Sequence, residues 1–104
     1  MYKRQHPPPT RAHTATLLDR KILTYGGGER GNYYRDAYVL DTVSRRWSHA
    51  RLQPSSPEPP PRRAHTAVLY KSRVVVFGGG NGTEALNDCW ALDPGRNVGL
   101  DAMK

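Results

Sequence analysis

Residues 7–41 have the sequence PPPTRAHTATLLDRKILTYGGGERGNYYRDAYVLD, and residues 59–93 have the sequence PPPRRAHTAVLYKSRVVVFGGGNGTEALNDCWALD. The two stretches align without a gap at a constant offset of 52 residues, so that Arg11 matches Arg63 and Asp41 matches Asp93. Three consecutive glycines stay in step within them. Chance can give a shared tripeptide but not an ungapped match of this length, so the chain contains two copies of one structural unit.

Both copies are predicted to consist of short strands. In the first copy we expect strands at residues 12–18, 21–25, 37–41 and 46–50, and in the second copy at residues 64–70, 73–77 and 89–93. Consecutive glycines end the second strand of each copy. Residues 74–77 are apolar at every position, which indicates that both faces of this strand are buried. No segment has a sustained helical apolar period, so we expect no helix.

A repeat of about 50 residues built from four short strands is typical of a β-propeller blade. Each copy has a Pro-Arg segment before a His-Thr strand, an apolar strand that ends in glycines, and an Arg-Asp or Asn-Asp step into an aromatic strand that ends in Leu-Asp. Trp47 follows in the first copy. In these features the chain resembles the kelch-repeat family over nearly its whole length. The resemblance implies an all-β fold, a partial kelch-type β-propeller with two antiparallel blades.

Two positions depart from the family pattern. Arg62 stands three residues before His65, as is usual in kelch repeats, whereas Thr10 holds the matching place before His13. The second copy has Gly99 where a tryptophan should follow, and residues 94–104 do not resemble a strand. We therefore expect a complete four-stranded first blade and a second blade that lacks its outer strand.

The expected layout is a first blade with the start of a linker at residues 7–53, a stiff Pro-rich linker at 54–61, an incomplete second blade at 62–94 and a tail at 95–104. The side chains expected to be buried between or within the sheets are Tyr25, Tyr38, Leu40, Val75, Phe77, Trp90 and Leu92. Propellers typically close with about 4–8 blades, so two blades leave sheet faces and strand edges uncovered. We therefore do not expect a self-sufficient monomer.

Length and composition restrict the function classes. The 104 residues suffice for one small domain. The net charge of +7 favours acidic partners, but the basic residues are scattered in pairs and form no recognised nucleic-acid motif, so no specific nucleic-acid partner is expected. The single cysteine excludes an internal disulfide framework. No apolar run approaches the roughly 20 residues of a membrane span, and no signal-peptide core is visible, so we expect no membrane contact and a cytoplasmic location.

Two motifs match a known binding or modification site, but each has a simpler structural interpretation. The segment from Gly26 to Gly31 matches the dinucleotide-binding pattern G-x-G-x-x-G, yet a strand rather than the required helix follows it, and the second copy has Thr83 in place of the third glycine. We interpret the glycines as residues that leave the strand with unusual backbone angles and let neighbouring blades approach closely. Asn81-Gly82-Thr83 is a glycosylation sequon that we interpret as turn chemistry.

The residues that could form a metal or redox site also have simpler structural interpretations. His13 and His65 are equivalent, but no third or fourth ligand lies near them in sequence, so we expect a histidine that holds a loop by hydrogen bonds. Cys89 stands where the first copy has Ala37, and we expect it to be a small buried apolar residue. Galactose oxidase, a kelch-bladed enzyme class, uses copper with a Cys–Tyr crosslink, but nothing in this sequence brings such residues together. We predict no catalytic residue, no metal site and no cofactor.

The predicted function is that of a non-enzymatic protein–protein interaction module, either a fragment or an assembling part of a larger propeller. The alternatives are a fragment of a galactose-oxidase-like copper oxidase and a truncated gene product without independent activity. The expected partner is a protein or acidic peptide, together with further kelch blades or a second copy of the chain.

Arginine and asparagine side chains in the loops after the glycines and before the first strands are predicted to hold carboxylates. These residues are Arg11, Arg30, Asn32, Arg35, Arg62, Arg63, Asn81 and Asn87. The recurrence of Arg11 and Arg63 also fits packing against a neighbouring blade.

Overall fold

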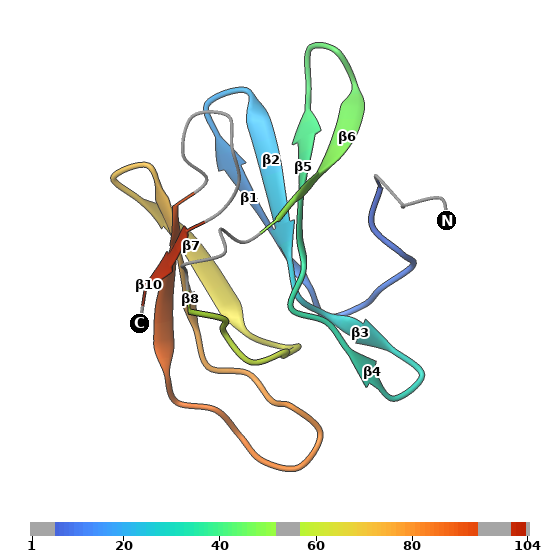
Figure 1. Cartoon of the computed structure of the whole chain (residues 1–104), viewed down its shortest axis with the longest axis vertical. Coiled ribbons are helices and arrows are strands. Elements are labelled where there is room, and N and C mark those ends of the chain that lie inside the picture. Colours follow the sequence, from blue (N-terminus) through green and yellow to red (C-terminus); the bar gives the residue numbers. More distant parts are fainter. Residues whose placement is uncertain (1–5, 52–56, 94–100, 104) are drawn as a thin grey trace.

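The computed structural model describes residues 6–51 and 57–93, and the backbone of residues 101–103. Two four-stranded antiparallel sheets lie side by side, with a two-stranded hairpin at one end of the first (Figure 1). The first sheet has the order β1-β2-β5-β6, with β1 at Thr14–Leu18, β2 at Lys21–Tyr25, β5 at Ala37–Asp41 and β6 at Arg46–Ala50. The hairpin pairs β3 (Gly28–Glu29) with β4 (Asn32–Tyr33). The second sheet has the order β10-β9-β8-β7, with β7 at Thr66–Tyr70, β8 at Arg73–Phe77, β9 at Cys89–Asp93 and β10 at Asp101–Met103.

The all-β prediction is confirmed, and five of the seven predicted strands have the predicted bounds. The described segments contain no helix, and hence none long and apolar enough to cross a membrane. The first strand of each sheet begins two residues later than predicted. The reason is that Ala12 and Ala64 both have a φ of +61°, in the left-handed region, where an extended strand cannot continue.

The prediction that the second blade lacks its outer strand is wrong. Asp101 pairs with Asp93, Ala102 with Leu92 and Met103 with Ala91, which makes β10 the fourth strand of that sheet. A three-residue segment without a β-branched or aromatic residue has little strand propensity of its own, so the pairing depends on the ladder that β9 offers. Residues 94–100, which lead into β10, and residues 54–56 of the predicted linker lie outside the described part of the chain.

Each sheet has two faces because successive side chains of a strand point to opposite sides. We call the side that carries Tyr25 in the first sheet and Phe77 in the second the front face, and the opposite side the back face. The front face of the first sheet packs against the back face of the second sheet. One apolar cluster fills this contact, and it consists of Leu23, Tyr25, Ala37, Val74, Val76, Trp90 and Leu92.

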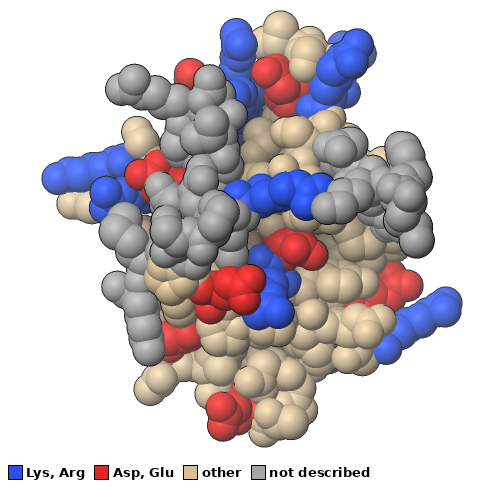
Figure 2. Space-filling view, viewed as in Figure 1, with Lys and Arg blue, Asp and Glu red and all other residues tan. Residues whose placement is uncertain are grey.

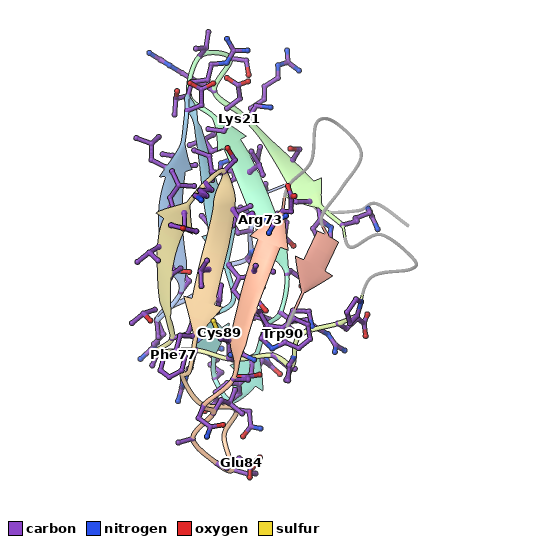
Figure 3. All side chains as sticks on the ribbon, turned by 90° about the vertical axis from the view of Figure 1, so that its left-hand side faces the viewer. Lys21, Arg73, Phe77, Glu84, Cys89 and Trp90 are labelled. Atoms are coloured by element: carbon purple, nitrogen blue, oxygen red, sulfur yellow. The ribbon has the colours of Figure 1, made fainter. Side chains whose placement is uncertain are left out.

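The burial predictions fail on the front face of the second sheet. Tyr25, Tyr38, Trp90 and Leu92 are buried as predicted, while Leu40 and Val75 are half-buried. Phe77 is instead 54% exposed, and Cys89 is also exposed. Figure 3 views this front face, with Phe77 on β8 and Cys89 on β9. Both predictions were wrong because they assumed a neighbouring sheet on that side, and none of the described residues supplies one.

Candidate interaction site

The loops predicted to form a binding rim lie together at one end of the two sheets. The β3–β4 hairpin and the loop that follows β8 both project from this end (Figure 1). Arg11 and Gly28 exchange two backbone hydrogen bonds of 2.9 and 3.0 Å, and Arg63 and Gly80 exchange two of 3.0 Å. The segment before the first strand of each blade therefore runs beside the Gly-rich segment of the same blade.

Gly26 of the first blade lies directly against residues of the second blade. Its φ is +69°, and a Cβ atom there would lie 2.7 Å from His65 Cε1 and 2.9 Å from the Arg62 carbonyl oxygen. The neighbouring Gly27 N–H donates to the Arg62 carbonyl at 2.8 Å. This confirms that the glycines permit unusual backbone angles and close approach. The chain continues from here into the β3–β4 hairpin, so the helix that a dinucleotide site needs is not formed.

Tyr33 joins the loops of the two blades, and sequence reasoning did not identify it. The guanidinium carbon of Arg63 lies 4.7 Å from the centroid of its ring. A Cβ atom at Gly82 would lie 3.1 Å from Tyr33 Cε1. Arg63 therefore packs against the neighbouring blade, the structural role that its recurrence suggested, while the equivalent Arg11 is exposed.

The remaining loop residues differ in how accessible they are. Arg30 has an 87% exposed side chain and lies 3.7 Å from the Glu29 carboxylate. The Arg35 side chain is 47% exposed and lies 3.6 Å from Glu58. Asn32 and Asn87 are exposed. These side chains are accessible, and the two arginines have acidic neighbours.

Asn81 has a structural role. Its Oδ1 atom accepts hydrogen bonds of 3.0 Å from Thr83 N–H, from the Thr83 hydroxyl and from Glu84 N–H. This arrangement closes the turn after the glycines, as the turn interpretation of Asn81-Gly82-Thr83 predicted.

Arg62 does not belong to an accessible rim, contrary to the prediction. It is fully buried, and its Nη1 and Nη2 atoms each donate to one carboxylate oxygen of Asp88 at 2.8 Å. Nη1 also donates to the Gly78 carbonyl at 3.0 Å, and Nε donates to the Pro60 carbonyl at 3.3 Å. The hydrogen bonds from Arg62, with a further one from Trp90 Nε1, lower the pKa of Asp88 to about 2. The guanidinium group thus makes four hydrogen bonds to Pro60, Gly78 and Asp88 and is not available to a partner.

His65 connects the two blades. Its Nε2 atom lies 2.8 Å from the Thr14 hydroxyl, and its ring meets the Tyr25 ring edge-on at 5.4 Å between centroids. Burial, together with the nearby Arg62 charge, lowers the pKa of His65 to about 4, and burial raises the pKa of Tyr25 to about 12. Both groups are therefore neutral at pH 7. A structural histidine that makes a hydrogen bond is therefore found at His65, whose partner Thr14 is the first residue of β1, whereas the equivalent His13 is exposed.

Charge and metal-binding groups are dispersed. On the face shown in Figure 2, Lys and Arg side chains alternate with Asp and Glu side chains and form no continuous basic stripe. Across the described segments, no three His, Cys, Asp or Glu residues gather closely enough to hold a metal ion.

Comparisons with known proteins give a consistent result. The family model described as "KLHDC2/KLHL20/DRC7 Kelch-repeats domain" matches residues 1–99. The flagellar outer-arm dynein alpha chain of Chlamydomonas reinhardtii is 34% identical over 94 residues, which cover 88% of this chain and 2% of that protein. An F-box/kelch-repeat protein of Arabidopsis thaliana is 36% identical over 96 residues, which cover 88% and 20%. Tip elongation aberrant protein 3 of Schizosaccharomyces pombe is 30% identical over 114 residues, which cover 84% and 10%. The chain spans at most a fifth of the length of these relatives.

Proposed function

The chain belongs to the kelch-repeat family, and from this premise we propose that it is a non-enzymatic protein–protein interaction module that functions as an assembling part of a larger propeller. Its first partner is a further kelch blade, which docks on the front face of the second sheet. A partner protein then binds at the loop end.

The observation that carries this proposal is the unequal burial of equivalent residues. Tyr25 on the front face of the first sheet is 1% exposed, whereas Phe77 at the equivalent place in the second sheet is 54% exposed. Thr16 is 9% exposed, whereas its equivalent Val68 is 61% exposed. The same surface is therefore covered by a blade in one case and bare in the other, which is typical of a site that another blade fills.

A blade that docks on the second sheet would need an apolar face like the back face of the second sheet, which packs against the first sheet. The back face of the first sheet has this character, because Ile22, Thr24, Tyr38 and Leu40 occupy the positions of Val74, Val76, Trp90 and Leu92. A second copy of the chain can therefore dock head to tail on the first. Such a contact joins different surfaces of the two copies, and it forms a closed ring if the rotation between blades allows it.

Sedimentation equilibrium of the purified chain tests the docking step. We expect the wild-type chain to associate, and we expect Phe77→Glu to abolish association because the charge would be buried in the contact. Val43→Glu is the matched control, since Val43 is 68% exposed and lies in the turn between β5 and β6. A wild-type chain that stays monomeric at high concentration and binds no apolar dye contradicts the proposal.

The binding end is proposed to recognise an acidic peptide. Arg11, Arg30, Asn32, Arg35 and Asn87 are accessible there, and guanidinium groups bind carboxylates through charge-assisted hydrogen bonds. Arg35 and Arg30 would exchange Glu58 and Glu29 for carboxylates of the partner.

Charge reversal tests this site. Replacing Arg30 and Arg35 with Glu should weaken binding of a hexaglutamate peptide and reduce its dependence on salt, as measured by fluorescence anisotropy. Replacing Arg45 and Arg46 with Glu makes the same change of charge at the opposite end of the sheet, at the last residue of the β5–β6 turn and the first residue of β6. Equal effects of the two double substitutions would mean that the peptide responds to net charge alone.

The recurring aspartates support a non-enzymatic function. Asp88 neutralises Arg62, and Asp41 Oδ1 accepts hydrogen bonds from the N–H groups of Val43 and Ser44 at 2.9 and 3.2 Å. Both carboxylates are thus used in holding the blade together.

A further inference from the structure

The first blade has a cavity in the place where the second blade holds the side chain of Arg62. The cavity has a volume of about 280 Å³, and Pro8, Thr10, Gly26, Asp36, Tyr38 and Trp47 contribute to its walls. We call it the Thr10 cavity. Five of these six residues are equivalent, at the 52-residue offset, to Pro60, Arg62, Gly78, Asp88 and Trp90. The cavity is therefore surrounded by the counterparts of the Arg62 site. These are the counterparts of Arg62, of the three residues that accept its hydrogen bonds, and of Trp90, which donates to Asp88.

The backbone around the two places is the same. Gly26 N–H donates to the Asp36 carbonyl at 3.2 Å, and Gly78 N–H donates to the Asp88 carbonyl at 3.1 Å. The loop that carries the aspartate is therefore held against the glycine in the same way in both blades. What differs is the side chain at the position before the strand, which is arginine in the second blade and threonine in the first.

Thr10 cannot replace the arginine. Its hydroxyl donates to the Gly28 carbonyl at 3.4 Å, away from Asp36. Among the described residues, Asp36 contacts His49, whose Nε2 atom lies 3.6 Å from Asp36 Oδ1, compared with 2.8 Å in the Arg62–Asp88 ion pair. The Asp36 side chain is also 49% exposed, whereas that of Asp88 is 17% exposed. The cavity thus keeps an acidic group that is accessible and only loosely paired.

We propose that the Thr10 cavity binds the guanidinium group of an arginine side chain from a protein partner. An arginine entering from outside would meet the Asp36 carboxylate and the Gly26 carbonyl, as Arg62 meets Asp88 and the Gly78 carbonyl. Tyr38 and Trp47 add aromatic walls that attract a cation. The volume lies just below the range of about 300–1,000 Å³ that is usual for drug-sized ligands, which suits a single side chain.

Arginine is favoured over lysine by the geometry of the acceptors. In the second blade the two terminal nitrogens of Arg62 engage both oxygens of one carboxylate, and Nη1 also reaches a carbonyl. A planar guanidinium can make this set of bonds, whereas an ammonium group acts as a point charge. Tyr38 belongs both to the cavity wall and to the back face of the first sheet, so a blade that docks on this face would compete with the arginine. The Phe77→Glu chain, which is expected not to associate, keeps the cavity accessible.

The test uses N-acetyl-arginine methylamide, titrated in the millimolar range into isotope-labelled full-length chain and followed by NMR. The wild-type chain and Phe77→Glu are both titrated, so that failure of blade docking leaves this result interpretable. We expect saturable shifts of the Gly26, Asp36 and Tyr38 amides, and no such shifts at Gly78 and Asp88, where Arg62 already fills the place. The lysine and citrulline analogues should bind at least tenfold more weakly.

Two variants complete the test. Thr10→Arg should abolish binding, because the new side chain can occupy the cavity as Arg62 does in the second blade, while Ser44→Arg adds the same charge in an exposed turn and should leave binding unchanged. Asp36→Asn should weaken binding at least tenfold. Absence of saturable binding, retention of binding in Thr10→Arg, or equal binding of the citrulline analogue would overturn the proposal.

Discussion

Mild acid should destabilise the fold through His65. The imidazole is buried between the blades, and its pKa is lowered to about 4 from an ordinary value of 6.5. Between these two values the unfolded chain binds a proton that the folded chain does not, so stability falls as the pH falls through this window. This difference in pKa between the unfolded and the folded chain corresponds to a loss of about 3 kcal/mol in the free energy of unfolding once His65 is protonated in both states. Small domains are stable by about 5–15 kcal/mol, so the change is a large part of the total.

Urea denaturation at several pH values between 7.5 and 4.5 measures this effect. The pH range in which His65 affects stability lies above the range in which the carboxylates do so. The pKa of Asp88 is lowered from 3.8 to about 2, so its protonation changes the stability only below about pH 3.8. The same holds for Asp41, whose pKa is lowered by hydrogen bonds from the Ser44 and Val43 amides. The loss of stability above pH 4.5 is therefore assigned to histidine.

His13 provides the matched control for His65, because the two are equivalent in the repeat and His13 is exposed. The free energy of unfolding of His65→Gln should depend on pH by about 2–3 kcal/mol less than that of the wild type across this range. His13→Gln should follow the wild type. If His65→Gln and the wild type lose stability in parallel, burial of a neutral His65 is not the cause and the reasoning is refuted.

Three further predictions concern the contact between and within the blades. Arg62→Ala should cost about 3 kcal/mol of stability in thermal or urea unfolding, because it leaves the Asp88 carboxylate without its main partner, while Arg63→Ala should cost about 1 kcal/mol or less. Gly26→Ala should destabilise more than Gly31→Ala, since both residues have positive φ but only Gly26 has atoms within 4 Å of the added methyl. Filling the Thr10 cavity by Thr10→Arg should raise the unfolding midpoint, and an unchanged or lower midpoint would show that the first blade cannot hold an arginine as the second does.

The strands inside each repeat were predictable because local chemistry determines them. Glycines end β2 and β8, and alternating or continuous apolar residues define β5, β8 and β9, so their bounds agree with the prediction. The start of β1 and β7 could not be read from propensity, because Ala12 and Ala64 carry no signal for a left-handed φ. β10 was missed since three residues without strand propensity pair only because β9 presents an open edge.

The site was predicted less well because it depends on contacts between segments distant in sequence. The grouping of the loops followed from the repeat, but the roles of Arg62 and Tyr33 did not. A signal for Arg62 was present, since an arginine found in one copy alone, with an aspartate 26 residues later, is compatible with a buried pair inside that copy. No comparable signal marked Tyr33, whose contacts with Arg63 and Gly82 come from the neighbouring blade.

Because the two blades are repeats, each residue can be compared with its equivalent in the other blade. Two such comparisons, Phe77 with Tyr25 and Thr10 with Arg62, have different explanations. Phe77 and Tyr25 are both aromatic, so their difference in exposure comes from the missing neighbour and not from the residue. Thr10 and Arg62 differ in the residue itself, while the glycine and aspartate around them keep the same backbone hydrogen bond. We propose that another blade of the same kind covers the front face of the second sheet, because a surface that fits such a face is already present within the chain. We propose that an arginine side chain enters the Thr10 cavity, because the cavity keeps the acceptor groups that bind Arg62 in the second blade while the sequence has threonine at that position.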